Sequence, residues 1–276
     1  MAKRSRINKI EKLIKEGRGT GRLGEYKPWI LIQDVSSSGR STRLKGIKTK
    51  RQHDFLSDME TNYFYILEYA DSVIDIREQY PLLPIEETLQ IANELGIEHP
   101  KNPRTNEYIV MTTDFFITQN NNLDLARTVK SKDDLCNKRV LEKFEIERVY
   151  WERKGIDWGI VTNEEINKTV AQNIKFFHSY YDISNLDVFI DLDEMEIQDI
   201  ILEYIRRISD TNISIREISR VFENDLSLLK GTGISVFKYL LARKVIEVDI
   251  TKEIDINKSM DISLKEKIVS KEFNIS

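Results

Sequence analysis

The chain of 276 residues contains one cysteine, Cys136. It therefore lacks the residues for an intramolecular disulfide framework or for a Cys-x-x-Cys metal site. Its three histidines are scattered and form no His-x-x-x-His pair: His53, His99 and His178. No run of about 18 apolar residues is present, which argues against a transmembrane helix. The basic start MAKRSRINKI is not followed by the apolar segment of a secretory signal.

Apolar and charged residues are both well represented. Hydrophobic residues make up 40% of the chain and charged residues 32%, with a net charge of -4. This composition supports a packed core and is too apolar for a disordered chain. The length suggests about two domains. We expect a soluble intracellular protein.

The charge is distributed unevenly along the chain. Residues 1–51 contain 15 Lys or Arg and four acidic residues, a net charge of +11, and the other 225 residues have a net charge of -15. A basic arm on an acidic body suggests a polyanionic partner such as DNA or RNA. The alternative is a flexible, solvated tail. Against it, the arm contains segments typical of ordered elements: GRGTGRLG (17–24), PWILIQDV (28–35) and SSSGRS (36–41).

The hydrophobic pattern of the first 180 residues predicts an α/β domain with a mixed sheet. The central signal is a β-hairpin with NNN (120–122) as its turn. The expected elements are helix 10–16, helix 55–69 capped by Ser57, strand 73–80, helix 88–96, hairpin strands 107–119 and 123–130, helix 133–154, strand 156–162, and helix 163–181 capped by Asn163.

The remainder of the chain predicts a small, mostly helical domain. Helices are expected over 186–209, 214–222 and 234–243, followed by a strand at 244–250, while 251–276 shows no clear pattern. This order suits a winged helix-turn-helix, although other small helical bundles share it. Residues 182–276 have 13 basic and 19 acidic residues, so docking to a protein is an alternative to DNA binding. We assign 1–175 to a catalytic domain that includes the basic arm, and 176–276 to a winged-helix-like domain.

Three ionisable residues form a candidate nuclease site. Asp114 lies on the first hairpin strand, Lys130 ends the second, and Glu60 lies on the helix before them. An Asp followed by (Asp/Glu)-x-Lys on a hairpin is typical of the restriction-endonuclease-like core. Carboxylates bind Mg²⁺, which activates water and neutralises phosphate charge, and a lysine stabilises the charge that develops. Thr128 shares a strand face with Lys130, and the Val129 carbonyl is a further candidate metal ligand.

Structural roles for the same residues remain open at this point. Asp114 and Lys130 also fit an exposed salt bridge on the hairpin, and Glu60 fits a cap partner of Ser57. Arg77 and Glu78 are candidates for an ion pair on the face of their strand.

Several stretches of the sequence resemble the TnsA family, the endonuclease subunits of Tn-seven-type heteromeric transposases. They occur in one order and cover most of residues 15–167. They are KEGRGTG (15–21), YKPWILIQDVSSSGRS (26–41), LSDMETNYF (56–64), VIDIREQYPLLP (73–84), GIEHP (96–100), MTTDFF (111–116) and LEKFEIERVYWERKGIDWGIVTNEEIN (141–167).

The resemblance implies a bacterial, cytoplasmic enzyme that associates with the nucleoid when active and cleaves the 5′ ends of a transposon. It also implies double-stranded transposon-end DNA, a TnsB-like DDE transposase and a TnsC-like AAA+ regulator as partners, with no membrane. Glu60, Asp114 and Lys130 match the catalytic acids and lysine of the family, with Mg²⁺, or Mn²⁺ in its place, as cofactor. Thr128 departs from the family's usual Gln, so we expect Glu60, Asp114 and the Val129 carbonyl to provide most of the metal ligands.

Two other classes of function remain alternatives. One is a free-standing restriction-like or repair endonuclease. The other is a non-catalytic DNA-binding adaptor.

Overall fold

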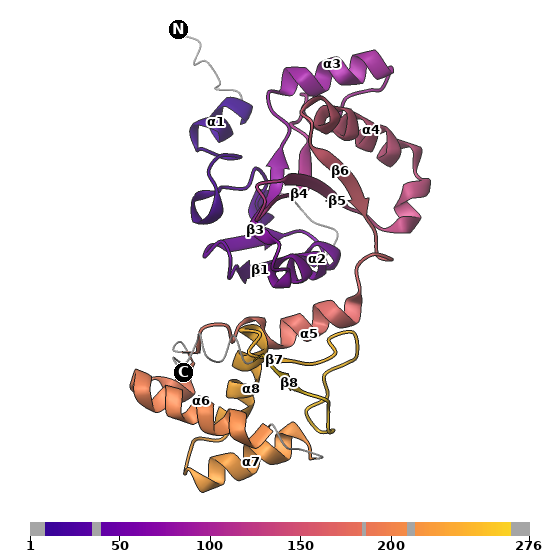
Figure 1. Cartoon of the computed structure of the whole chain (residues 1–276). Coiled ribbons are helices and arrows are strands. Elements are labelled where there is room, and N and C mark those ends of the chain that lie inside the picture. Colours follow the sequence, from indigo (N-terminus) through magenta and orange to yellow (C-terminus); the bar gives the residue numbers. More distant parts are fainter. Residues whose placement is uncertain (1–8, 35–39, 184–185, 209–212, 266–276) are drawn as a thin grey trace. The chain divides into compact units, whose positions relative to one another are not determined.

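The computed structural model describes residues 9–34, 40–183, 186–208 and 213–265. The chain divides into two compact units, Met1–Ile166 and Asn167–Ser276 (Figure 1). This division falls nine residues before the boundary expected from the sequence, so the helix Lys168–His178 goes with the C-terminal unit.

The N-terminal unit is built on a four-stranded mixed sheet, as the sequence predicted. The strands lie in the order β3-β4-β5-β6; the first three are antiparallel, and β6 runs parallel to β5. A parallel neighbour requires a crossover connection, and helix α4 lies within the segment that provides it. The strands span Val73–Pro81 (β3), Thr112–Gln119 (β4), Asp124–Val129 (β5) and Asp157–Val161 (β6), and α4 spans Lys138–Arg153.

Helices cover both faces of this sheet (Figure 1). Helix α2 (Asp58–Tyr69) packs on one face, where Phe64 joins the cluster of Phe115 and Val129. Helices α3 (Ile85–Leu95) and α4 lie on the other face, where Trp151 stacks on Phe116. Burial of aromatic and aliphatic side chains on both faces fixes the strand ends that carry the candidate site.

The described part of the basic arm is folded onto the core. It forms α1 (Lys9–Lys15), two 3₁₀ turns (Leu23–Glu25 and Ile32–Asp34) and β1 (Thr42–Lys45), which pairs with β2 (Gln52–Phe55) just after the arm in an unpredicted hairpin. Tyr26 and Trp29 of the arm are buried. The alternative of a flexible tail is therefore wrong for these residues. Residues 1–8 and most of SSSGRS lie outside the described ranges.

Several element boundaries differ from prediction for local reasons. The first hairpin strand begins at Thr112 instead of residue 107. Helix α4 begins at Lys138, after a 3₁₀ turn (Lys132–Cys136), because Asn137 accepts a hydrogen bond from Arg139 N. The cap of the next helix is Asn167, which accepts from Val170 N, whereas Asn163 accepts from Lys132 N.

The C-terminal unit is mostly helical, as predicted. It consists of α5 (Lys168–His178), a 3₁₀ turn (Asp187–Phe189), α6 (Glu194–Ile208), α7 (Ile215–Asp225), α8 (Thr232–Ala242) and the two-residue strands β7 (Ile246–Glu247) and β8 (Ser263–Leu264). Helix α6 starts later than expected because Asp193 and Glu196 form a reciprocal capping box. The strand expected over 244–250 is limited to β7, which pairs antiparallel with β8.

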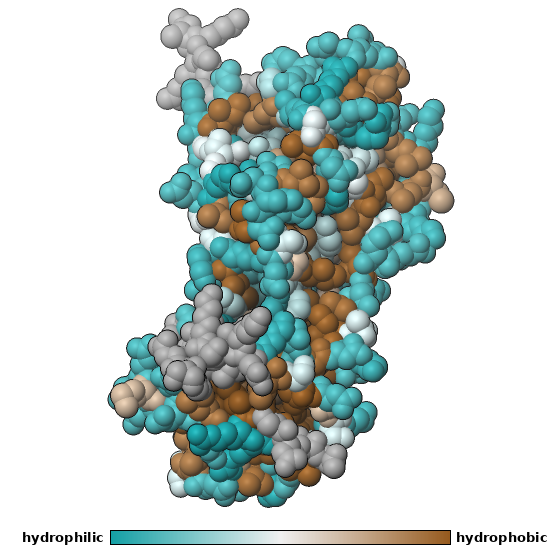
Figure 2. Space-filling model, viewed as in Figure 1, coloured by the Kyte–Doolittle hydropathy of each residue, from teal (hydrophilic) through white to brown (hydrophobic). Residues whose placement is uncertain are grey.

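Helix α8 occupies the centre of this unit. Most of its side chains are buried, and its Lys238 packs over the rings of Phe176 and Tyr180. A recognition helix needs one face free to enter a DNA groove, so α8 does not have the surface of a DNA reader. The exposed apolar side chains of the unit include Ile190, Met195 and Leu229. On the face shown in Figure 2, hydrophilic and hydrophobic residues intermingle over the surface.

Within the described ranges, no helix combines the length and apolar character needed to cross a bilayer.

Candidate active site

Glu60 lies in the first turn of α2, held by the predicted capping box. Ser57 Oγ accepts a hydrogen bond from Glu60 N (3.1 Å) and donates one to Glu60 Oε1 (2.8 Å). The other oxygen, Oε2, accepts from Leu56 N at 3.1 Å. The carboxylate is therefore buried and fixed by local bonds. The capping role is confirmed, and it orients the acid where α2 meets the sheet.

Asp114 lies on β4, opposite Gln79 of β3. The register places Glu78 opposite Phe115 and Tyr80 opposite Thr113. Asp114 Oδ1 accepts from Gln79 Nε2 at 3.1 Å, and Oδ2 accepts from Val129 N at 2.8 Å. The β4–β5 ladder runs only as far as Phe115. The Val129 amide thus donates to a side-chain carboxylate of β4 and not to a backbone carbonyl of that strand.

Gln79 was not singled out from the sequence. Its Nε2 donates to Asp114, and its Oε1 accepts from Thr112 Oγ1 at 3.0 Å. No local signal marks it, because a glutamine within a predicted strand is ordinary. The one indication available was its place in the family-like stretch VIDIREQYPLLP.

The pKa values of both acids lie above their ordinary values. Burial, and then the negative charge of Asp114, raises the pKa of Glu60 to about 7. Burial raises the pKa of Asp114 to about 6, against the lowering effects of the Val129 amide, the Gln79 amide and the charge of Lys130. Neighbouring carboxylates in a low-dielectric site favour a shared proton or a cation. Their oxygens are the ligands that hard divalent cations prefer, so these residues fit the implied metal.

Lys130 follows directly after β5. Its backbone N donates to Val161 O (3.0 Å), and its Nζ lies 3.3 Å from Asp134 Oδ2. The side chain is 37% exposed, and its charge acts on Asp114. Lys130 therefore influences Asp114 through its charge, and Asp114 influences Glu60 in the same way. A salt bridge on the hairpin would require Lys130 to pair with Asp114. Lys130 instead pairs with Asp134.

Thr128 faces a further acid, Glu147 of α4, which the sequence did not single out. The hydroxyls of Thr128 and Thr113 donate to Glu147 Oε1 at 2.5 and 2.6 Å. Burial raises the pKa of Glu147 to about 7. In the sequence Glu147 is one of many charged residues on a long helix. A role of Thr128 as a direct metal ligand stays a prediction.

Acidic ligands alone do not complete a metal centre. Among the residues that the structure describes, no group of three or more His, Cys, Asp or Glu side chains is arranged to hold a metal ion. Glu60, which is buried, and Asp114, which is partly buried, provide two carboxylates. Mg²⁺ is often bound by one or two carboxylates and keeps several waters.

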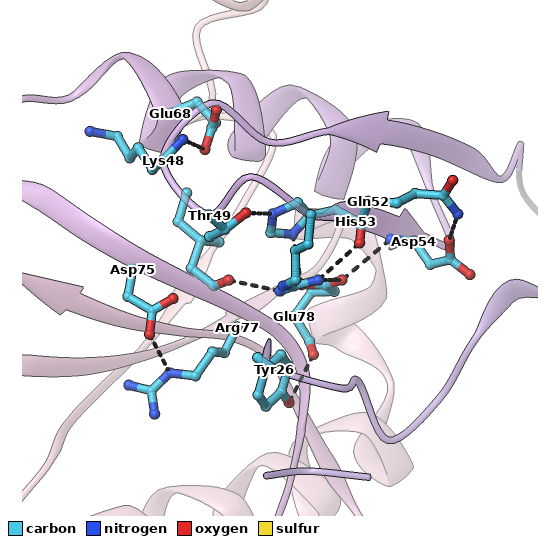
Figure 3. Close-up of polar contacts among 12 residues, drawn as sticks. Tyr26, Lys48, Thr49, Gln52, His53, Asp54, Glu68, Asp75, Arg77 and Glu78 are labelled. Atoms are coloured by element: carbon cyan, nitrogen blue, oxygen red, sulfur yellow. Dashed lines mark hydrogen bonds and ion pairs between the residues drawn. The ribbon is translucent and has the colours of Figure 1, made fainter. Parts of the chain in front are cut away.

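A polar cluster surrounds Glu78, the residue before Gln79 (Figure 3). Glu78 is fully buried and pairs with Arg51, and its Oε2 lies 2.8 Å from His53 Nδ1. Arg77 instead donates to Thr118 Oγ1 at 2.7 Å and lies over the Phe116 ring. The predicted Arg77–Glu78 pair is wrong, because successive strand residues point to opposite faces.

Comparison with known proteins agrees with this architecture. A family model described as "TnsA-like endonuclease N terminal" matches residues 70–163, and one described as "TnsA endonuclease C terminal" matches residues 165–250. The Tn7 transposition protein TnsA of Escherichia coli is 46% identical over 172 residues. The chain belongs to the TnsA endonuclease family. The alignment with the E. coli protein spans 62% of this chain and 62% of that relative.

The TnsA family models and the two units divide the chain at nearly the same place. The N-terminal TnsA-like model ends at residue 163 and the C-terminal one begins at 165, next to the structural division at Ile166. Asp114 and Lys130 lie within the first model. Glu60 precedes it, so the fold brings that acid to the TnsA-like region from outside the matched segment.

Proposed function

We propose that the protein is a metal-dependent DNA endonuclease subunit of a heteromeric transposase. It cleaves the 5′, non-transferred strands at transposon ends during cut-and-paste transposition. The observation that carries this proposal is the proximity of a buried acid, Glu60, and a partly buried acid, Asp114, to Lys130 at the end of the hairpin. Membership of the TnsA family supports the same reaction class.

The residues of the site divide the work of phosphodiester hydrolysis. Glu60, Asp114 and the Val129 carbonyl would hold Mg²⁺, or Mn²⁺ in its place, which would supply an activated water and neutralise phosphate charge. The N–H and C=O of one strand residue point to the same side. The Val129 amide donates to Asp114, which supports its carbonyl facing the same acid. Lys130 stabilises charge on the scissile phosphate.

Thr128 has two roles to separate. Its hydroxyl orients Glu147 through the hydrogen bond at 2.5 Å. A direct contact of this hydroxyl with the metal is the alternative that a Thr128→Gln variant tests.

The two units have different partners in this proposal. The arm and the nuclease core bind double-stranded DNA, because the first 51 residues have a net charge of +11. The acidic C-terminal unit, whose central helix is buried, docks to proteins of the transposition complex: a TnsB-like DDE transposase and a TnsC-like AAA+ regulator. The complex acts in the bacterial cytoplasm, on the nucleoid.

The direct test replaces Asp114 in a complete transposition mixture. Asp114→Ala removes the carboxylate, and Asp114→Asn keeps its shape. Both should lose 5′-strand cleavage while retaining the melting temperature of the wild type within a few degrees. Cleavage by Asp114→Ala at the wild-type rate would refute the assignment.

The same preparation discriminates the alternatives. Cutting of naked DNA by the pure protein would indicate a free-standing nuclease. Undiminished cleavage in the complete mixture by a protein lacking Glu60, Asp114 and Lys130 together would indicate an adaptor.

A further inference from the structure

The backbone at Gln79 is unusual for a residue inside a strand. Its φ is 49°, in the left-handed region that favours glycine. The residue is nevertheless buried, at 3% exposure. Such a conformation persists only where the surrounding structure determines it. The neighbours of Gln79 therefore explain its orientation.

Two residues of the basic arm bond to the backbone around this position. Trp29 N donates to the carbonyl of Gln79 at 3.2 Å. The Tyr26 hydroxyl donates to the carbonyl of Glu78 at 3.1 Å (Figure 3). The arm thus donates hydrogen bonds to the carbonyls of two consecutive residues of β3, Glu78 and Gln79.

Glu78, the residue before Gln79, is held by bonds to its own side chain. Arg51 binds both of its carboxylate oxygens, and Asp54 N donates to Oε1 at 3.3 Å. Burial raises the pKa of Glu78, but the contacts with His53 and Arg51 outweigh it and hold the value at about 2. Residue 78 is thereby fixed to the arm, and residue 79 is directed to the acids.

We propose that Gln79 is a positioning residue of the nuclease site, held by the arm so that its amide fixes Asp114 for metal binding together with Glu60. This inference rests on the proposed nuclease function. Its Nε2 donates to Asp114 at 3.1 Å, and its Oε1 accepts from Thr112. An uncharged donor orients this carboxylate without neutralising it, which leaves the negative charge available to a cation.

Two variants separate the amide from the backbone. Gln79→Met keeps the length of the side chain and removes its donor. Gln79→Gly removes the donor and adopts a left-handed φ without strain. Gln90→Met is the matched control, because Gln90 lies exposed on α3. For each full-length protein, Mn²⁺ binding is measured by calorimetry, melting by thermal denaturation, and transposon-end cleavage as a function of Mn²⁺ concentration.

Both Gln79 variants should bind Mn²⁺ about tenfold or more weakly, since groups that orient metal ligands contribute 10–100-fold to affinity. Excess Mn²⁺ should restore part of the cleavage. Gln79→Gly should melt close to the wild type, and Gln90→Met should match the wild type throughout. Wild-type Mn²⁺ affinity in Gln79→Gly would overturn the proposal and leave Gln79 with a structural role only.

The result also separates this inference from the proposed function. If the wild type binds Mn²⁺ and Asp114→Asn does not, the nuclease site stands, and retained binding in the Gln79 variants refutes the positioning role alone. If the wild type neither binds Mn²⁺ nor cleaves transposon ends in the complete mixture, both proposals fail.

Discussion

The two acids of the site should make the metal-free protein less stable as the pH rises. The pKa of Glu60 is about 7 in the folded protein, against 4.5 as its ordinary value. The folded state therefore holds this proton more tightly than the unfolded state. Its contribution is fully present below pH 4.5, is lost as the pH rises towards 7, and stays lost above that.

The size of the effect follows from the same values. At about 1.4 kcal/mol per pH unit, a pKa of about 7 instead of 4.5 corresponds to about 3 kcal/mol, of which between about 2 and 3 kcal/mol falls between pH 5 and pH 8. For a domain of this size, 1 kcal/mol changes the melting temperature by about 2–4 °C. We expect a loss of about 5–10 °C from this site.

The assay is thermal melting at pH 5, 6, 7 and 8 with a chelator, for the wild type and for Glu60→Gln. The difference between the two proteins isolates Glu60 from other titrating groups, such as Glu147, which the variant retains. The melting temperature of Glu60→Gln, relative to that of the wild type, should increase as the pH rises. Mn²⁺ should raise the melting temperature of the wild type at pH 8 more than at pH 5. A difference that is constant across the four pH values, or no effect of Mn²⁺ at pH 8, would refute the reasoning.

Three further predictions address other parts of the molecule. Arg51→Met removes one of the partners of the buried Glu78 carboxylate. The free energy of unfolding, measured by chemical denaturation, should fall by about 3–5 kcal/mol. Thr128→Gln should alter the preference between Mg²⁺ and Mn²⁺ in cleavage if residue 128 contacts the metal, and an unchanged preference contradicts that contact. Gly233→Ala places a Cβ 2.6 Å from Ser219 Cβ between α7 and α8. It should destabilise the C-terminal unit by about 1–3 kcal/mol in thermal melting, with Mn²⁺ binding unchanged.

The elements that the sequence predicted well are those with strong local signals. The β4–β5 hairpin combines apolar strands with an asparagine turn, and Asn122 adopts the left-handed φ of 61°. The capping box of Glu60 involves residues only three apart. In both cases the determining contacts lie within a few residues of each other, so their spacing carries the information.

The features that the sequence did not reveal depend on distant partners. Strands β1 and β2 are four residues each, with polar side chains, and give little alternation. The pairing of Glu78 with Arg51 joins residues 27 apart, and the Gln79–Asp114 contact joins residues 35 apart. Asn163 and Asn167 are both reasonable helix caps, and the burial of Ile166 between them places that residue in the sheet's core instead of in the helix.

The contact between the arm and β3 also sets an order for folding during synthesis. The arm emerges from the ribosome before β3, so Arg51 cannot pair with Glu78, and Tyr26 and Trp29 cannot bond to the carbonyls of residues 78 and 79, until that strand has been made. A nascent chain that stops before residue 78 would therefore carry a basic segment with its aromatic side chains unburied. The smallest fragment expected to fold as a nuclease unit thus starts before Tyr26 and includes β6.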